Sequence, residues 1–168
     1  MSLLCSRIQT AINSYCPHPK SCTGISHREE IAIRGLWEKL NLKDQKEIVV
    51  LNAPDSFAAE LKALKRVRVH RRISGIKELT FALVFVATKI ELDESAKMIL
   101  SKASGDALLW FAYPKGTSTK YKCEVNRDSG WDILRKSGFD TVRQVAIDED
   151  WSALRFRRIE FINHRAAT

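Results

Sequence analysis

Polar side chains follow each apolar run that the sequence predicts to be a buried strand. Such runs cover residues 46–51, 79–87 and 107–113. In open α/β sheets, ligands bind beyond the carboxyl ends of the strands. We therefore predict one polar ligand pocket at these ends and at the last turn of the chain, formed by Asn52, Pro54, Asp55, Thr88, Tyr113, Lys115, Asp148 and Trp151.

The loop after the third run carries groups that could hold a phosphate. Its segment Lys115–Lys120 reads KGTSTK and combines two ammonium groups and three hydroxyls with a flexible glycine. This composition is similar to that of a phosphate-binding loop, although the spacing of the P-loop motif is absent. The alternative is an ordinary exposed loop, because loops are often polar without binding anything.

An acidic cluster, Asp148-Glu149-Asp150, precedes Trp151 near the end of the chain. Its carboxylates could bind a cation or act as acid–base groups. The alternative is a tight turn in which Asp148 accepts hydrogen bonds from nearby backbone N–H groups. Trp151 then either caps the pocket or packs beneath the turn.

The turn after the first run contains no glycine. It reads Asn52-Ala53-Pro54-Asp55, and Pro54 also lacks a backbone N–H donor. Dinucleotide sites use glycines here, because a glycine backbone can approach the ligand closely. We therefore expect no cofactor, and S-adenosylmethionine is disfavoured.

Cysteine spacing predicts no metal site. Cys16 and Cys22 lie six residues apart, which matches no common zinc motif. Free thiols in a reducing compartment are the expected state. Cys123 lies in a basic loop, whose positive charges would lower the pKa of its thiol.

Positive charge is concentrated in one segment of a chain whose formal net charge is +8. Residues 62–77 hold seven basic residues and no acidic one. Such a block attracts phosphates, nucleic acid or an acidic partner, but basic residues also protect an edge strand from aggregation. The segment has no aromatic side chain on which a base could stack. The predicted anion or nucleic-acid surface consists of Lys65, Arg66, Arg68, Arg71 and Arg72.

Strand and helix patterns alternate along most of the chain. Capping-box patterns at Ser26 and Thr88 predict the starts of two helices, and Gly105 is expected to end the second. Residues 128–137 predict a further helix, and the chain finishes on two strand patterns joined by a short turn. Alternation implies a parallel sheet with helices on both faces. The fold class is therefore α/β: a three-layer sandwich with a mostly parallel sheet ending in an antiparallel hairpin.

This order of elements resembles a truncated class I methyltransferase fold, in which the last strand inserts into the sheet. One strand–helix unit is missing between Val69 and Leu79. More closely, the segments LNAP (51–54), WFAYPK (110–115) and DEDWSALRF (148–156) together resemble a bacterial domain-of-unknown-function family with a shortened methyltransferase-like (Rossmann-like) layout. The resemblance covers about residues 30 to 160 and implies a fold but no activity. Methyltransferases carry an acid after the second strand, where this chain has His70-Arg71-Arg72.

We expect an N-terminal appendage over residues 1–25, one Rossmann-like domain over 26–162 and a tail over 163–168. The longest apolar stretch, Phe81–Ala87, is too short to span a bilayer, so no membrane contact is predicted and the expected location is the cytoplasm. The main functional hypothesis is a non-enzymatic, methyltransferase-like domain that binds a protein partner or an anionic small ligand. The alternatives are a methyltransferase with an atypical S-adenosylmethionine loop and a nucleic-acid-binding module.

Overall fold

A computed structural model describes residues 35–163 of the chain. Several predictions fall outside these residues: the appendage over 1–25, the capping box at Ser26, the cysteine spacing of Cys16 and Cys22, and the tail except for residue 163. The described part begins with a helical turn over residues 35–39, which precedes the first strand.

Six strands form one sheet in the order β2-β1-β3-β4-β6-β5. Neighbouring pairs from β2 to β4 are parallel, and β6 is antiparallel to both β4 and β5. The predicted mostly parallel sheet with a closing hairpin is therefore confirmed. The strands are β1 (Glu47–Leu51), β2 (Arg68–His70), β3 (Leu79–Phe85), β4 (Ala103–Pro114), β5 (Phe139–Ala146) and β6 (Trp151–Arg158).

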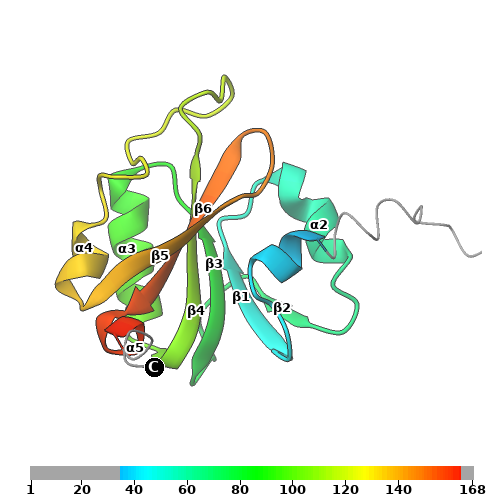
Figure 1. The fold of residues 1–168 in the computed structure, drawn as a ribbon. Coiled ribbons are helices and arrows are strands. Elements are labelled where there is room, and N and C mark those ends of the chain that lie inside the picture. The colour runs from blue at the N-terminus through cyan, green and yellow to red at the C-terminus, as the bar shows by residue number, and fades with distance from the viewer. Residues whose placement is uncertain (1–34, 164–168) are drawn as a thin grey trace, which may run out of the picture.

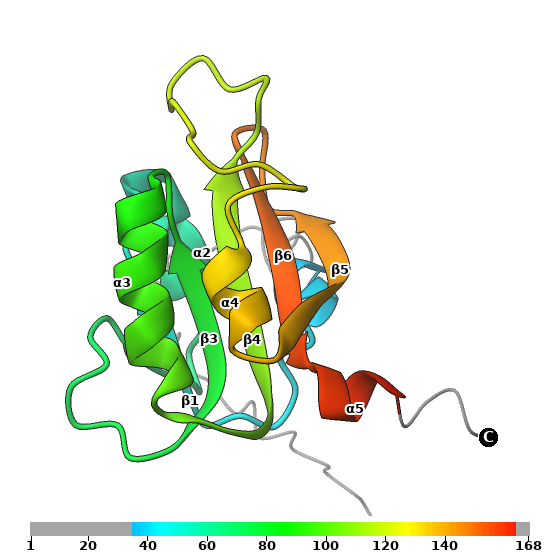
Figure 2. The same cartoon turned by 90° about the vertical axis from the view of Figure 1, so that its left-hand side faces the viewer.

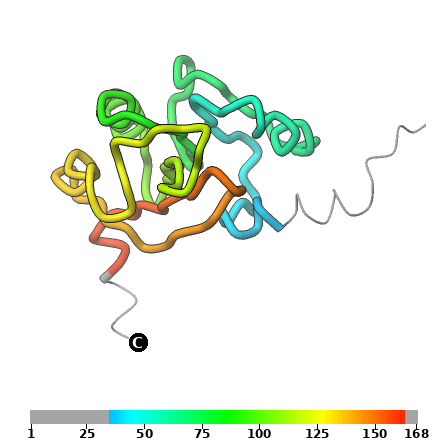
Figure 3. Tube along the Cα trace, turned by 90° about the horizontal axis from the view of Figure 1, so that it is seen from above, coloured from blue at the N-terminus to red at the C-terminus, as the bar shows by residue number. Residues whose placement is uncertain are grey.

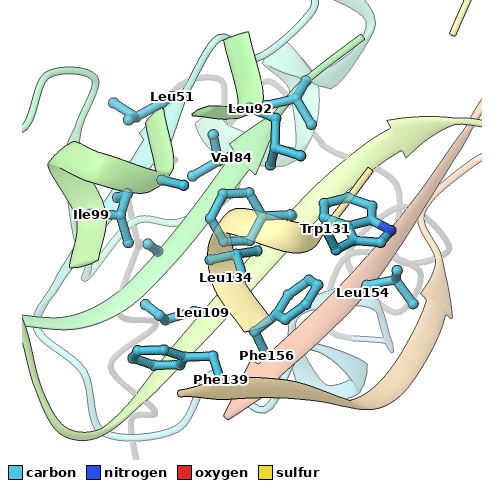
Figure 4. Close-up of a cluster of buried hydrophobic side chains, with 14 of the residues drawn as sticks. Leu51, Val84, Leu92, Ile99, Leu109, Trp131, Leu134, Phe139, Leu154 and Phe156 are labelled. Carbon is cyan, nitrogen blue, oxygen red and sulfur yellow. The ribbon is translucent and has the colours of Figure 1, made fainter. Parts of the chain in front are cut away.

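Two helices cover one face of the sheet, α3 (Lys89–Leu100) and α4 (Asp132–Lys136) (Figures 1 and 2). The apolar positions of α3 recur at helical spacing, so one side of this helix faces the sheet. Leu92 and Ile99 of α3 and Leu134 of α4 are completely buried there, around the rings of Trp131 and Phe156 (Figure 4). These residues belong to the first core cluster, which holds α3 and α4 against the sheet.

The opposite face is covered by residues 35–39 and by the short helices η1 (Asp55–Phe57) and α2 (Ala58–Lys62). Trp37 and Phe57 pack against the strands here, with their ring centroids 5.8 Å apart. Trp110 of β4 is fully buried in the same cluster, and its indole N–H donates to the carbonyl of Leu40 at 2.9 Å. This second core cluster therefore ties the segment before β1 to the centre of the sheet.

No helix or strand separates β2 from β3, so the strand–helix unit expected to be missing is indeed absent from the described chain. The predicted capping box at Thr88 is also confirmed: its hydroxyl accepts from the backbone N–H of Glu91, and the Glu91 carboxylate accepts from the N–H of Thr88. Both contacts satisfy N–H groups that would otherwise lack a partner at the start of α3.

Three details differ from the sequence-based expectations. Gly105 does not end α3, which stops at Leu100; it lies inside β4 with φ of 51°. The helix expected over residues 128–137 is shorter, because Asn126 builds a turn with the N–H groups of Asp128 and Ser129 before α4 begins. The last strand ends at Arg158 and is followed by a short helix, α5 (Ile159–Asn163). Among the described residues, no helix is long and apolar enough to cross a bilayer.

Candidate functional site

The first turn of the sheet, directly after β1, bends at Asn52. Its φ of 54° lies in the left-handed region, which glycine and, among other residues, asparagine adopt most readily. Pro54 immediately precedes η1, and its carbonyl accepts from the N–H of Phe57 at 2.9 Å. Asn52 and Asp55 are exposed. The turn thus makes a left-handed bend without a glycine, and the preference of asparagine for this region was a sequence signal that the prediction did not use.

A topological switch point lies beside this turn. The chain leaves β1 for β2 on one side of the strand, whereas β3 lies on the other side. The connection after β1 enters α2 on one face, and the connection after β3 enters α3 on the opposite face (Figure 3). Open α/β sheets bind ligands at such a switch point, in a crevice beyond the carboxyl ends of the two strands. Asn52, Asp55 and Thr88 are the predicted site residues that the fold places around it.

The β5–β6 hairpin brings a second group of predicted residues together. The ammonium group of Lys115 donates to the carbonyl of Asp148 at 2.6 Å. The Asp148 carboxylate accepts from the N–H groups of Asp150 at 2.8 Å and Trp151 at 2.7 Å. Asp148 thus makes the backbone contacts of a tight turn, which was the alternative to a role in cation binding or acid–base chemistry. Ligand binding by Lys115 and Asp148 remains a prediction, and both residues already hold the turn together.

Asp150 connects the hairpin to the loop that follows β4. Its carboxylate accepts from Ser118 Oγ at 2.9 Å and from Lys120 Nζ at 3.0 Å. These two hydrogen bonds favour the charged carboxylate and hold the pKa of Asp150 below its usual value. The same ion pair raises the pKa of Lys120. The ion pair between Asp150 and Lys120 therefore attaches the loop after β4 to the β5–β6 hairpin.

We expect acid to loosen this loop. The pKa of Asp150 is lower in the folded protein than in the unfolded chain. The stabilising contribution of its charged carboxylate is therefore complete above the unfolded-state pKa and is lost as the pH falls through the folded-state pKa. Amide protection factors of residues 118–121, measured at neutral and acidic pH, should fall in acid. Asp150→Asn should lower them at neutral pH already. Glu149→Gln, an exposed neighbour, is the control; an equal effect of both variants would contradict the assignment.

Tyr113 and Trp151 point into the two cores. Tyr113 packs against Trp131 in the first cluster, and its hydroxyl accepts from the amide of Gln144 at 3.0 Å. Burial raises the pKa of this phenol. Trp151 is only 4% exposed and packs in the second cluster. Its ring centroid lies 5.1 Å from that of Phe85 and 4.9 Å from that of Tyr121. Neither side chain therefore joins Asn52 at the crevice. Within the described residues, the indole N–H of Trp151 has no acceptor.

The basic segment forms the edge of the sheet at β2, as the structural alternative for it predicts. Arg68 and His70 both contact the carboxylate of Glu47 in β1, at 3.2 and 3.1 Å. The remaining predicted surface residues, Lys65, Arg66, Arg71 and Arg72, are side chains of the flanking loops. Binding of an anion or of nucleic acid by this edge remains a prediction.

Cys123 does not have the activated thiol that its basic neighbours suggested. Burial raises the pKa of the thiol, and this is the largest influence on it. The S–H group contacts the carbonyl of Val125. Desolvation of the thiolate is therefore the dominant effect on this residue, and the basic neighbours in sequence do not lower its pKa.

Comparisons with known proteins show likeness in fold alone. No protein-family model and no curated protein matches the sequence. Among solved structures, magnesium protoporphyrin IX methyltransferase from Synechocystis PCC 6803 with bound SAH shares 9% identity at a TM-score of 0.47, over 78% of this chain and 81% of that chain. Ribosomal protein L11 methylase from Lactobacillus delbrueckii subsp. bulgaricus shares 10% identity at a TM-score of 0.46, over 80% of this chain and 81% of that chain. A LepI complex with SAM shares 9% identity at a TM-score of 0.47, over 79% of this chain and 40% of that chain.

The expectation that the chain has no cofactor is corrected. Two of these similar structures hold S-adenosylmethionine or its demethylated product, S-adenosylhomocysteine. The expectation rested on the glycine-free first turn, and Asn52 makes the left-handed bend of that turn without a glycine. The absence of glycine therefore does not exclude an adenosyl cofactor.

Proposed function

We propose that this chain binds S-adenosylmethionine at the crevice between the ends of β1 and β3, as a methyltransferase-type domain. The observation that carries the proposal is the switch point between these parallel strands, with the left-handed turn at Asn52 on its rim. The strand order creates the switch point at which open α/β sheets bind ligands, and Asn52 and Asp55 of the turn are exposed beside it. The S-adenosyl compounds in structures of similar fold select the ligand to be tested.

At this position, Asp55 could supply the carboxylate that methyltransferases use to hold the ligand. Methyltransferases place an acid after their second strand, but β2 ends at His70, opposite Val49, before the end of β1 is reached. Asp55 is the exposed carboxylate that the first turn brings to the crevice instead. It would accept hydrogen bonds from the ribose hydroxyls or from the ammonium group of the ligand.

Other groups complete the rim. The backbone at Asn52 and Ala53 would lie closest to the ligand, because Pro54 has no N–H to offer. Thr88 begins α3 on the far side of the crevice; its oxygen accepts from Glu91, and its hydroxyl proton is able to donate. When bound, S-adenosylmethionine supplies an electrophilic methyl group; the contribution of this chain is to hold and orient it.

Calorimetric titration of the full chain with S-adenosylmethionine and S-adenosylhomocysteine tests the proposal. We expect both to bind and Asp55→Ala to weaken binding about tenfold, the effect of removing one charge-assisted hydrogen bond. Asn52→Gly should retain affinity, because glycine adopts the same φ without strain.

Asp44→Ala is the matched control, since Asp44 is also an exposed carboxylate but precedes β1 at the other end of the strand. Its affinity should equal that of the unaltered chain. Absence of heat with both adenosyl compounds, or equal weakening by Asp44→Ala and Asp55→Ala, would show that the crevice is not an adenosyl site.

A further inference from the structure

A cationic groove of about 750 Å³ lies at the end of the sheet opposite to the first turn. One wall comes from Lys43 and Gln45, which immediately precede β1, and the floor comes from the early part of β4 and the late part of β6. Leu108 of β4 lines the groove and packs against the second core cluster, so the groove opens on the face of the sheet that residues 35–39 cover only in part. It is separate from the crevice proposed above.

Four cationic side chains and one acidic side chain line this groove: Lys43, Arg143, Arg155 and Arg157, with Asp106. Arg157 is already neutralised, because its guanidinium donates twice to the Asp106 carboxylate, through Nε at 2.7 Å and through one terminal nitrogen. This bidentate pair fixes the plane of Arg157. Arg155 has partners within the protein as well. Lys43 and Arg143 are exposed, and no carboxylate among residues 35–163 pairs with either.

A β-bulge turns Arg143 into the groove. Thr141 pairs with Phe156 of β6, and Arg143 pairs with the next residue of β6, Arg155, so Val142 is the extra residue. In a regular ladder Arg143 would lie opposite Leu154, whose side chain faces the first core cluster. The bulge therefore places it on the other face of the sheet, which is a recognised use of bulges.

The bulge thus gathers positive charge on this face of the sheet. Arg143 and Arg155 lie directly opposite one another on adjacent antiparallel strands. Arg155 is in turn the register partner of Trp110, at the centre of the sheet. An anion seated between Arg143 and Lys43 would gain charge-assisted hydrogen bonds, and the Arg143 guanidinium would offer them in a planar arrangement.

We propose that the groove binds a small phosphorylated molecule without an aromatic ring, of the size of a sugar phosphate. Guanidinium groups match the geometry of phosphate oxygens, and Lys43 adds a point charge. The volume is within the range of small-molecule sites, about 300–1,000 Å³. No described residue that lines the groove is aromatic, so a nucleobase would find nothing to stack on. Gln45 offers hydrogen bonds to hydroxyl groups instead.

Calorimetric titration of the full chain at constant ionic strength tests the groove, with ribose 5-phosphate, inorganic phosphate, ribose and AMP as probes. We expect the phosphorylated probes to bind, ribose to give no heat, and AMP to bind no better than ribose 5-phosphate. Arg143→Gln and Lys43→Gln should each weaken ribose 5-phosphate about tenfold. Both side chains are exposed, so these variants should fold; an unchanged melting temperature without ligand verifies it.

Arg135→Gln is the matched control, because Arg135 is an exposed arginine of α4, which covers the opposite face of the sheet. It should bind ribose 5-phosphate as tightly as the unaltered chain. Equal weakening by Arg135→Gln would show that the loss reflects net charge and not the groove, and would overturn the proposal. So would no detectable binding of either phosphate probe, and a clear preference for AMP that Arg143→Gln abolishes would overturn the ring-free ligand class.

Discussion

Replacing Trp110 by alanine is expected to lower the free energy of unfolding by about 3–5 kcal/mol, the usual cost of truncating a buried tryptophan. Trp110 is completely buried on β4 and donates its indole N–H to the carbonyl of Leu40. The alanine variant therefore loses core packing and also releases the segment before β1. Urea denaturation followed by circular dichroism measures the change.

Trp110→Phe separates the two contributions. Phenylalanine retains much of the apolar volume but leaves the Leu40 carbonyl without its donor, which costs about 1–3 kcal/mol for a buried group. We expect it to fall between the alanine variant and the unaltered chain. A loss below about 1 kcal/mol in Trp110→Ala would mean that this tryptophan does not organise the second core cluster.

Gly130→Ala is expected to destabilise the fold by about 2–4 kcal/mol, because backbone strain and steric overlap act together. Gly130 has φ of 100°, and an added Cβ would lie 2.6 Å from Cγ1 of Val125. Val125 is buried in the first core cluster and cannot move aside freely. The loop would have to shift together with Trp131, whose indole N–H donates to the carbonyl of Asn126 at 2.7 Å.

Gly116→Ala in the same loop is the matched control. A Cβ atom added at Gly116 would meet nothing within 4 Å, and the φ of this residue is not in the left-handed region. The unfolding midpoint of this variant should equal that of the unaltered chain. If both glycine variants were equally stable, Gly130 would owe its place to something other than conformation and space.

Local sequence patterns predicted most of the sheet, since each predicted strand is a run of apolar or alternating residues that one or both faces bury. The capping box at Thr88 was equally local and was found in place. Gly105 misled because a glycine after a helix pattern is typical of a helix end, whereas here the neighbouring strand β3 draws it into β4 through the pair Leu79–Ala103. The pairing of β4 with β3 therefore determined the conformation of this segment, against the local preference of glycine for a helix end.

The candidate sites were less predictable for the same reason. The left-handed bend at Asn52 depends on one φ angle, and asparagine only favours that value. The groove depends on the bulge at Val142, which reverses the side that Arg143 faces. A register shift of this kind has no signature in apolar periodicity, since its two strands still alternate on either side of the bulge. Alternating Arg155 and Arg157 were the visible part of the pattern.

The position of β6 determines when this domain can complete itself during synthesis. β6 is made last of the six strands, yet it lies between β4 and β5. Until the ribosome has released residue 158, β4 has an unpaired edge and β5 has no partner within the described chain. The nascent sheet then exposes the backbone of a strand whose side chains are largely apolar, a state prone to aggregation. A chaperone that shields β4 would therefore be most useful in the interval before residue 158 has left the ribosome.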